Sequence, residues 1–230
     1  MTADRDDATR SAVVDRYLEC IFYIDAEGDV VRPGRLATWL GVAPPTVTET
    51  IRRLERDGWV VVATDRSIAL TNRGRDAASD LVRRHRVLER WLTDVLGFDW
   101  VTADVEAERL ATAMSDEVVQ RLDDAMGHPA TCPHGNVIPG RQVGLDSSLT
   151  ALSDVRSARE VTVRRISEVA EHDGHPLLRR LADAGVSEGQ VVSVLGTDAD
   201  SITIDVSGSS CTLPLSSASF VWVEECVSTQ

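Results

Sequence analysis

The sequence predicts an α+β protein with a winged helix-turn-helix at its N-terminal end, a helical middle part and a small β-rich part at its C-terminal end. Three observations predict this fold class. Apolar residues recur at helical spacing over much of the first half, two β-rich runs surround a polar connection within residues 59–70, and short β-rich segments separated by glycines occupy residues 161–223. The 230 residues suffice for two or three small domains with buried cores.

The first elements predicted are three helices. Apolar side chains at helical spacing predict a helix over residues 9–25, which ends before Gly28. A short helix over residues 34–40 ends at Gly41, and Pro45 suits the first turn of the helix that follows. Two helices joined by a short glycine-containing turn form a helix-turn-helix.

A β-hairpin is predicted directly after the third helix. Residues 59–63 and 68–70 are β-rich and enclose the polar residues 64–67. A hairpin in this position is a wing, which favours a nucleic-acid-binding domain. Two other interpretations remain open, because a small α+β domain without a nucleic-acid role and a winged helix that binds proteins would have the same pattern.

The middle part carries ionisable groups at helical spacing within residues 81–111. His85 and Glu89 lie four residues apart, as do Asp104 and Glu108, so each pair shares one helix face. A turn at Gly97 folds the second helix back toward the first, and one imidazole and three carboxylates can then converge. The alternative is that these groups are solvated charges on helix surfaces.

The C-terminal part follows a segment rich in Gly, Ser and Asp at residues 140–157, which is typical of a linker. Closely spaced short strands with one helix at residues 176–184 then predict a small barrel. We therefore expect four segments: a winged-helix domain at 1–75, a helical domain at 76–140, a linker at 141–158 and a β domain at 159–230.

The composition and the absence of certain motifs disfavour several classes of function. The 37 acidic residues outnumber 24 basic residues, all of them arginines, so the net charge of −13 disfavours general attraction to polyanions. Any DNA contact must use a local surface. The four cysteines lack CxxC spacing, and the polar N-terminus and short apolar runs predict a cytoplasmic protein without a membrane partner. No catalytic motif rises above chance, so neither an enzyme nor a small organic substrate is expected.

Several segments together resemble one family. The order of PPTVTETIRRLERDGWVVVATDRSIALTNRGR, RRHRVLERWLTDVLGFDW, MSDEVVQRL and HGNVIPG is similar to the diphtheria-toxin-repressor family of iron- and manganese-dependent transcriptional regulators. The resemblance implies a winged-helix DNA-binding domain, a helical dimerisation and metal-binding domain, and a C-terminal SH3-like domain. The function it implies is metal-dependent repression of metal homeostasis genes at an inverted-repeat operator in double-stranded DNA.

The resemblance also implies two metal sites. Residues at the family's ancillary site suit Fe²⁺ or Mn²⁺, and they are His85, Glu89, Asp104, Glu168 and Glu171. The primary site departs from the family, because its positions hold Arg16, Glu108, Ala111 and Thr112, and Glu19 alone does not complete it. We expect an Arg16–Glu108 salt bridge in its place, and the alternative is that Arg16 points to solvent. A DNA-binding regulator that is independent of metal or responds to another ligand remains the alternative.

A further group near the end of the helical part suggests a zinc site at first sight. Its members, His128, Cys132 and His134, match no common zinc module and are interrupted by Pro129, Pro133 and Gly135. The HGNVIPG stretch is therefore expected to be a turn rather than a metal site.

The expected DNA contacts lie on the third helix and the wing. Its first turns offer Pro45, Thr46, Thr48 and Glu49, and nearby arginines can neutralise phosphates, namely Arg52, Arg53 and Arg66. Glu49 stands where the family usually has Gln, which predicts a different operator sequence. Alternatively, Arg52 and Arg53 pair with Glu49 and Asp57 on the helix surface.

A homodimer is expected because the helical part is more apolar than one helix pair can bury. The residues concerned are Val101, Val105, Leu110, Val118, Val119 and Leu122.

Overall fold

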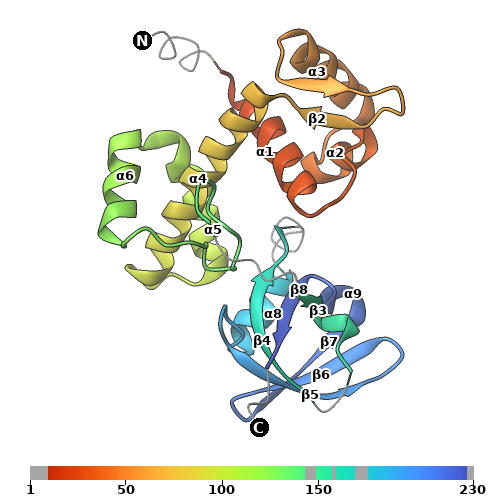
Figure 1. The fold of residues 1–230 in the computed structure, drawn as a ribbon, viewed down its shortest axis with the longest axis vertical. Helices are drawn as coiled ribbons and strands as arrows, with labels where there is room; N and C mark the ends of the chain where they lie inside the picture. Colours follow the sequence, from red (N-terminus) through yellow and green to blue (C-terminus); the bar gives the residue numbers. More distant parts are fainter. Residues whose placement is uncertain (1–9, 143–148, 157–158, 169–175, 227–230) are drawn as a thin grey trace. The chain divides into compact units, whose positions relative to one another are not determined.

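The computed structural model describes residues 10–142, 149–156, 159–168 and 176–226. The chain divides into two compact units, Met1–Arg83 and Arg84–Gln230 (Figure 1). The predicted division into four segments stays a prediction. None of the described helices is long and apolar enough to span a bilayer.

The first unit is a winged helix-turn-helix, as predicted. Its elements in chain order are α1 (Ala12–Ala26), α2 (Pro33–Leu40), α3 (Pro44–Arg56), β1 (Val60–Val62) and β2 (Ile68–Leu70). The Ser11 hydroxyl caps α1 by accepting a hydrogen bond from Val14 N, and α2 ends at Gly41, whose φ of 63° favours glycine. The fully buried Leu18, Leu36 and Leu54 come from all three helices and hold them together.

The 23-residue helix α4 (Asn72–Asp94) begins in the first unit and continues into the second. Its start packs closely on the chain between α3 and the wing. A Cβ on Gly74 would lie 2.1 Å from the carbonyl oxygen of Trp59, and Thr71 N donates to that same oxygen over 3.0 Å. Only glycine permits this approach.

The second unit contains two further helices, α5 (Trp100–Ala113) and α6 (Asp116–Ala125). Asp99 caps α5 by accepting from Thr102 N, and Ser115 caps α6 by accepting from Val118 N. These helices pack on the C-terminal half of α4 around a shared core of Val87, Leu88, Leu92, Ala103, Ala107, Val119 and Ile138.

The C-terminal part of the second unit is an antiparallel sheet with the strand order β3-β8-β4-β5-β6-β7. Its elements are β3 (Thr150–Ala151), η2 (Leu152–Asp154), β4 (Arg159–Ile166), α8 (Pro176–Asp183), β5 (Val191–Thr197), β6 (Ser201–Val206), β7 (Ser209–Pro214), α9 (Leu215–Ala218) and β8 (Val221–Glu225). In the described residues β3 and β7 are not paired, so the SH3-like sheet is open where a barrel was predicted. Trp100 of α5 belongs to the core of this sheet, which ties the helical and β parts into one unit.

We expect Gly74→Ala to lower the free energy of unfolding by about 1–3 kcal/mol, because its methyl group meets the Trp59 carbonyl. Gly34→Ala in α2 is the matched control. Nothing lies within 4 Å of a Cβ there, and alanine raises helix stability by up to roughly 1 kcal/mol. Urea denaturation measures both values, and equal stability of the two variants would contradict the packing described here.

Candidate functional site

Three of the predicted ligands meet between α4 and α5. His85 and Glu89 lie one turn apart on α4, and Asp104 lies on α5. His85 Nε2 is 3.1 Å from Asp104 Oδ1, and one ligand atom from each of the three residues lies within 4.8 Å of the others. The side chains of His85 and Asp104 are only 13% and 17% exposed. The structure thus brings together an imidazole and two carboxylates in a sheltered position.

Two residues that the sequence did not place in a metal site complete the cluster. Cys132 Sγ and His134 Nδ1 lie 4.0 Å apart, and His134 Nδ1 is 2.8 Å from Glu89 Oε1. Glu89, Cys132 and His134 are all buried and form a second triplet whose ligand atoms lie within 4.8 Å. Glu89 therefore belongs to both groups. The expectation that the Cys132–His134 segment is a turn rather than a metal site stays a prediction, although its side chains lie beside Glu89.

The segment is a turn, and its geometry places the side chains of Cys132 and His134 beside Glu89. Cys132 N donates to Asn136 O over 2.8 Å, and Gly135 N donates to Cys132 O over 3.0 Å. Gly135 has a φ of 81°, and a Cβ there would lie 1.9 Å from Arg164 O of β4. Only glycine allows the turn to sit this close to the sheet. His134 O also accepts a hydrogen bond from Ile166 N over 2.8 Å.

Glu168 follows β4 and is buried beside the cluster. Its carboxylate pairs with the guanidinium of Arg86, which also donates to the carbonyl of Val137. Both side chains of this ion pair are less than a tenth exposed. The remaining predicted ligand, Glu171, lies outside the described residues.

The electrostatics of the cluster favour a cation. Burial by itself lowers the pKa of His134, but the Glu89 carboxylate opposes this effect, with smaller contributions from Glu168 and Asp104, and the pKa is raised overall. The three carboxylates thus create a negative potential at the His134 ring. A proton on His134 compensates part of this negative potential, and a divalent ion can compensate more of it.

The donor set also fits a transition metal. A thiolate, imidazoles and carboxylates together form a mixed sulfur, nitrogen and oxygen set, which divalent Fe, Co, Zn and Mn accept to different degrees. Cys132 makes the set softer than the all-nitrogen-and-oxygen set predicted from the sequence. Elsewhere in the chain, burial raises the pKa of Cys20 in α1 to about 12, so that cysteine stays a thiol.

The residues of the degraded primary site lie in different units. Arg16 is on α1, where its guanidinium donates to Leu40 O over 3.1 Å, and Glu19 lies half-buried on the same helix. Glu108 is exposed on α5 in the second unit. The Arg16–Glu108 salt bridge therefore stays a prediction.

The expected DNA-reading residues lie on one exposed element. Pro45, Thr46, Thr48 and Glu49 are exposed in the first turns of α3, where the Thr48 hydroxyl donates to Pro44 O over 3.1 Å. In the described residues, Arg52 and Arg53 are exposed and make no ion pair with Glu49 or Asp57.

Two other arginines near the reading helix make contacts within the first unit. Arg73 stacks over Trp59 with its Cζ 3.8 Å from the ring centroid. Arg75 pairs with Asp25 over 3.2 Å. Both contacts lie at the start of α4 and help to hold it against the rest of the first unit.

The fold combines a winged helix with a helical part that carries a sheltered cluster of imidazole, thiol and carboxylate groups. This combination is typical of metal-responsive DNA-binding proteins. Comparison with known families agrees. Residues 10–68 match the iron dependent repressor N-terminal DNA binding domain, 71–140 the iron dependent repressor metal binding and dimerisation domain, and 150–225 the FeoA domain. The chain belongs to the iron-dependent repressor family.

Individual relatives support this membership over nearly the whole length. The iron-dependent repressor IdeR of Mycobacterium tuberculosis is 37% identical over 220 residues, covering 91% of this chain and 95% of the relative. The diphtheria toxin repressor of Corynebacterium diphtheriae is 35% identical over 217 residues, with the same coverage. A manganese-dependent transcriptional repressor solved in complex with manganese is 34% identical, with a TM-score of 0.78 over 93% of this chain and 100% of that one.

Cobalt(II) provides a test of the cluster. We expect Co²⁺ to produce a thiolate-to-metal charge-transfer band in the near ultraviolet, because Cys132 Sγ faces the other ligand atoms. Cys132→Ser should abolish the band. Cys211→Ser, at a half-buried thiol in β7, is the matched control and should leave it unchanged. A band that survives Cys132→Ser would show that this thiol is not a ligand.

Proposed function

We propose that this protein is a metal-dependent transcriptional repressor that binds an operator as a homodimer and senses Fe²⁺ or Mn²⁺ at the cluster centred on Glu89. The observation that carries the proposal is the convergence of His85, Asp104, Cys132 and His134 on that one buried carboxylate. Because α4 enters from the DNA-binding unit, an ion held on this helix acts on the same element that leads to the winged helix.

The ligands proposed are His85, Glu89, Asp104, Cys132 and His134, with Glu168 and Glu171 as further carboxylate donors. When bound, the metal supplies positive charge that compensates the buried carboxylates. Arg86 already supplies one such charge to Glu168. Its position favours a role in holding Glu168 in place beside the cluster.

For DNA, we propose that α3 enters the major groove with Thr46, Thr48 and Glu49 toward base edges and Pro45 at the start of the helix. A carboxylate accepts hydrogen bonds from the amino groups of cytosine or adenine. Exposed Arg52 and Arg53 contact phosphates, as does Arg66 in the wing. We propose that the protein acts on double-stranded DNA in the cytoplasm and is not an enzyme.

Part of the apolar set that the sequence suggested for the dimer surface is already covered within one chain. Val119 is buried, Leu110 and Leu122 pack on the helical core, and Val101 packs on the core of the β part. Four large apolar side chains in this region remain exposed, namely Val95, Leu96, Phe98 and Val118. We propose that they contribute to the contact with a second copy.

The central test is metal-dependent operator binding. We expect Mn²⁺ or Fe²⁺ to tighten binding of an operator duplex in an electrophoretic or fluorescence titration, and chelation to reverse it. Glu89→Gln should weaken metal binding at least about 100-fold and remove the metal effect on DNA. Glu117→Gln, at an exposed position on α6, serves as the control. Equally tight operator binding in chelator would favour the alternative, a regulator independent of metal.

A second test addresses the missing primary site. We propose that Arg16 and Glu108 form a salt bridge in its place, which supplies a built-in cation. Glu108→Ala should then weaken operator binding while the affinity for one metal ion per subunit stays unchanged. Glu106→Ala is the control, because Glu106 lies two residues before Glu108 on α5 and pairs with Arg109. Two ions per subunit, one of them lost in Glu108→Ala, would instead restore a primary metal site.

A further inference from the structure

A carboxylate in the β part contacts two residues that stand next to proposed metal ligands in the chain. Glu188 lies in the turn between α8 and β5. Its Oε2 accepts a hydrogen bond from Arg90 Nη1 over 3.1 Å, and its Oε1 accepts from the Thr131 hydroxyl over 2.7 Å. Arg90 follows Glu89 on α4, and Thr131 precedes Cys132. One carboxylate therefore holds both of these neighbours of the cluster.

Arg90 also ties the 132–136 turn to α4 directly. Its Nη1 donates to Cys132 O over 3.3 Å, and its Nε lies 3.1 Å from Asp94 Oδ2, one turn further along the helix. The side chains of Arg90 and Glu188 are only 22% and 25% exposed, so solvent screens their attraction less than that of a surface pair. The guanidinium is thus held in one position by partners on three segments.

The turn that carries Glu188 is fixed to β4 by backbone hydrogen bonds. Gly189 N donates to Val163 O, and Val163 N donates to Gln190 O, each over 2.8 Å. From Val163, β4 runs on toward Glu168, which follows the end of the strand. A contact at Glu188 therefore restrains the same strand that leads to Glu168.

Two arginines one helical turn apart on α4 make matching contacts with the rest of the second unit. Each guanidinium donates to a backbone carbonyl in residues 131–138 and to a carboxylate of the β part. The contacts join Arg86 to Val137 O and Glu168, and Arg90 to Cys132 O and Glu188. The two carboxylates differ, because Glu168 is a proposed metal ligand and Glu188 is not. A carboxylate that turns toward an ion gives up part of its contact with a guanidinium, so the Glu188 contact is the one that metal binding leaves intact.

We propose that Glu188 is a positioning residue for the metal cluster. Through Arg90 and Thr131 it holds the 132–136 turn and the β part against α4, whether or not Glu168 binds an ion. The inference rests on the proposed metal-sensing function. Metal affinity depends on such outer contacts, because ligands that are already held in place lose less conformational freedom when the ion binds.

The first test measures metal affinity. We expect Glu188→Ala to weaken Mn²⁺ binding about tenfold or more in a competition titration with a fluorescent chelator, because the 132–136 turn is released. Glu225→Ala is the control, since it removes a carboxylate of β8 that is 60% exposed and paired with Arg159, and it should leave the affinity unchanged. Wild-type Mn²⁺ affinity in Glu188→Ala would overturn the proposal, whatever the melting temperature of that variant.

A matched pair of variants at Thr131 isolates the hydroxyl contact. Thr131→Val has nearly the same shape but cannot donate to Glu188, whereas Thr131→Ser keeps the hydroxyl. We expect Thr131→Val to weaken Mn²⁺ binding about threefold or more and Thr131→Ser to bind like the wild type. Adding Thr131→Val to Glu188→Ala should weaken binding no further, because both changes remove the same contact. Equal affinity of the two Thr131 variants would overturn the proposal.

A third measurement needs no metal. In the metal-free protein, amide hydrogen exchange across residues 131–138 should be faster in Glu188→Ala than in the wild type, because Cys132 N and Ile138 N donate to backbone carbonyls there. Unchanged exchange would show that Glu188 does not hold the turn and would overturn the proposal. Failure of the wild type itself to bind Mn²⁺ or Fe²⁺ would instead refute the proposed function.

Discussion

A carboxylate buried near the C-terminal end of the long helix α4 is the constraint on which the second unit depends. Glu89 is 1% exposed, and a charge at that depth must be compensated by partners. The fold supplies them from three directions: His85 from the preceding turn of α4 and Asp104 from α5 on one side, and Cys132 and His134 from the turn on the other. The arrangement leaves an excess of negative charge, and a divalent ion balances it better than a single proton.

The close approach of the 132–136 turn to β4 makes this arrangement possible. Gly135 against Arg164 O and the hydrogen bond from Ile166 N to His134 O fix the turn between helices and sheet. The Arg86–Glu168 pair and the Arg90–Glu188 pair, 3.1 Å apart, make further links between α4 and the β part. The cluster around Glu89 therefore lies where the helical and β parts are joined. We expect the proposed metal binding to be energetically coupled to the association of these two parts.

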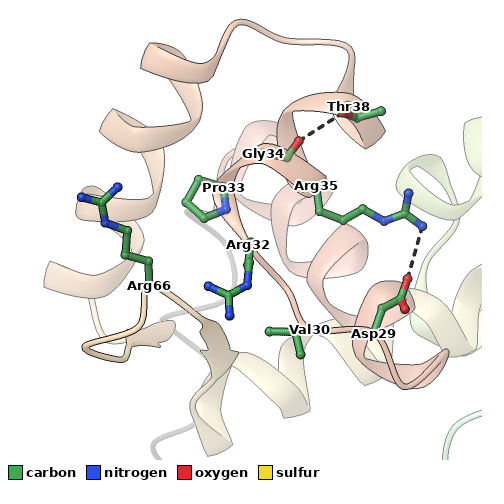
Figure 2. Close-up of a pocket in the computed structure, with 8 residues that line it drawn as sticks. All are labelled: Asp29, Val30, Arg32, Pro33, Gly34, Arg35, Thr38 and Arg66. Atoms are coloured by element: carbon green, nitrogen blue, oxygen red, sulfur yellow. Dashed lines mark hydrogen bonds and ion pairs between the residues drawn. The ribbon is translucent and has the colours of Figure 1, made fainter.

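In the first unit the physical problem is the reverse, because an acidic chain must attract a polyanion. It does so locally. Arginines needed for the fold are neutralised, as Arg75 is by Asp25, while Arg52, Arg53 and Arg66 remain exposed around α3. Arg32 combines both tasks, since it anchors the wing turn through Asp65 and still lines a cationic cleft of about 640 Å³ between the start of α2 and the wing turn (Figure 2). Local placement of charge thus matters more than the net charge of −13.

The sequence by itself determined the elements with local signals. Glycine and proline positions, helical spacing and the two β-rich runs within residues 59–70 identified the winged helix-turn-helix. The i, i+4 spacing placed His85 and Glu89 on one face of α4. Only the tertiary structure decided that Cys132 and His134 join Glu89, because no local pattern encodes a contact across 43 to 45 residues. It also decided that the six-stranded sheet stays open and that Trp100 belongs to its core, since strand pairing and burial depend on residues distant in the chain.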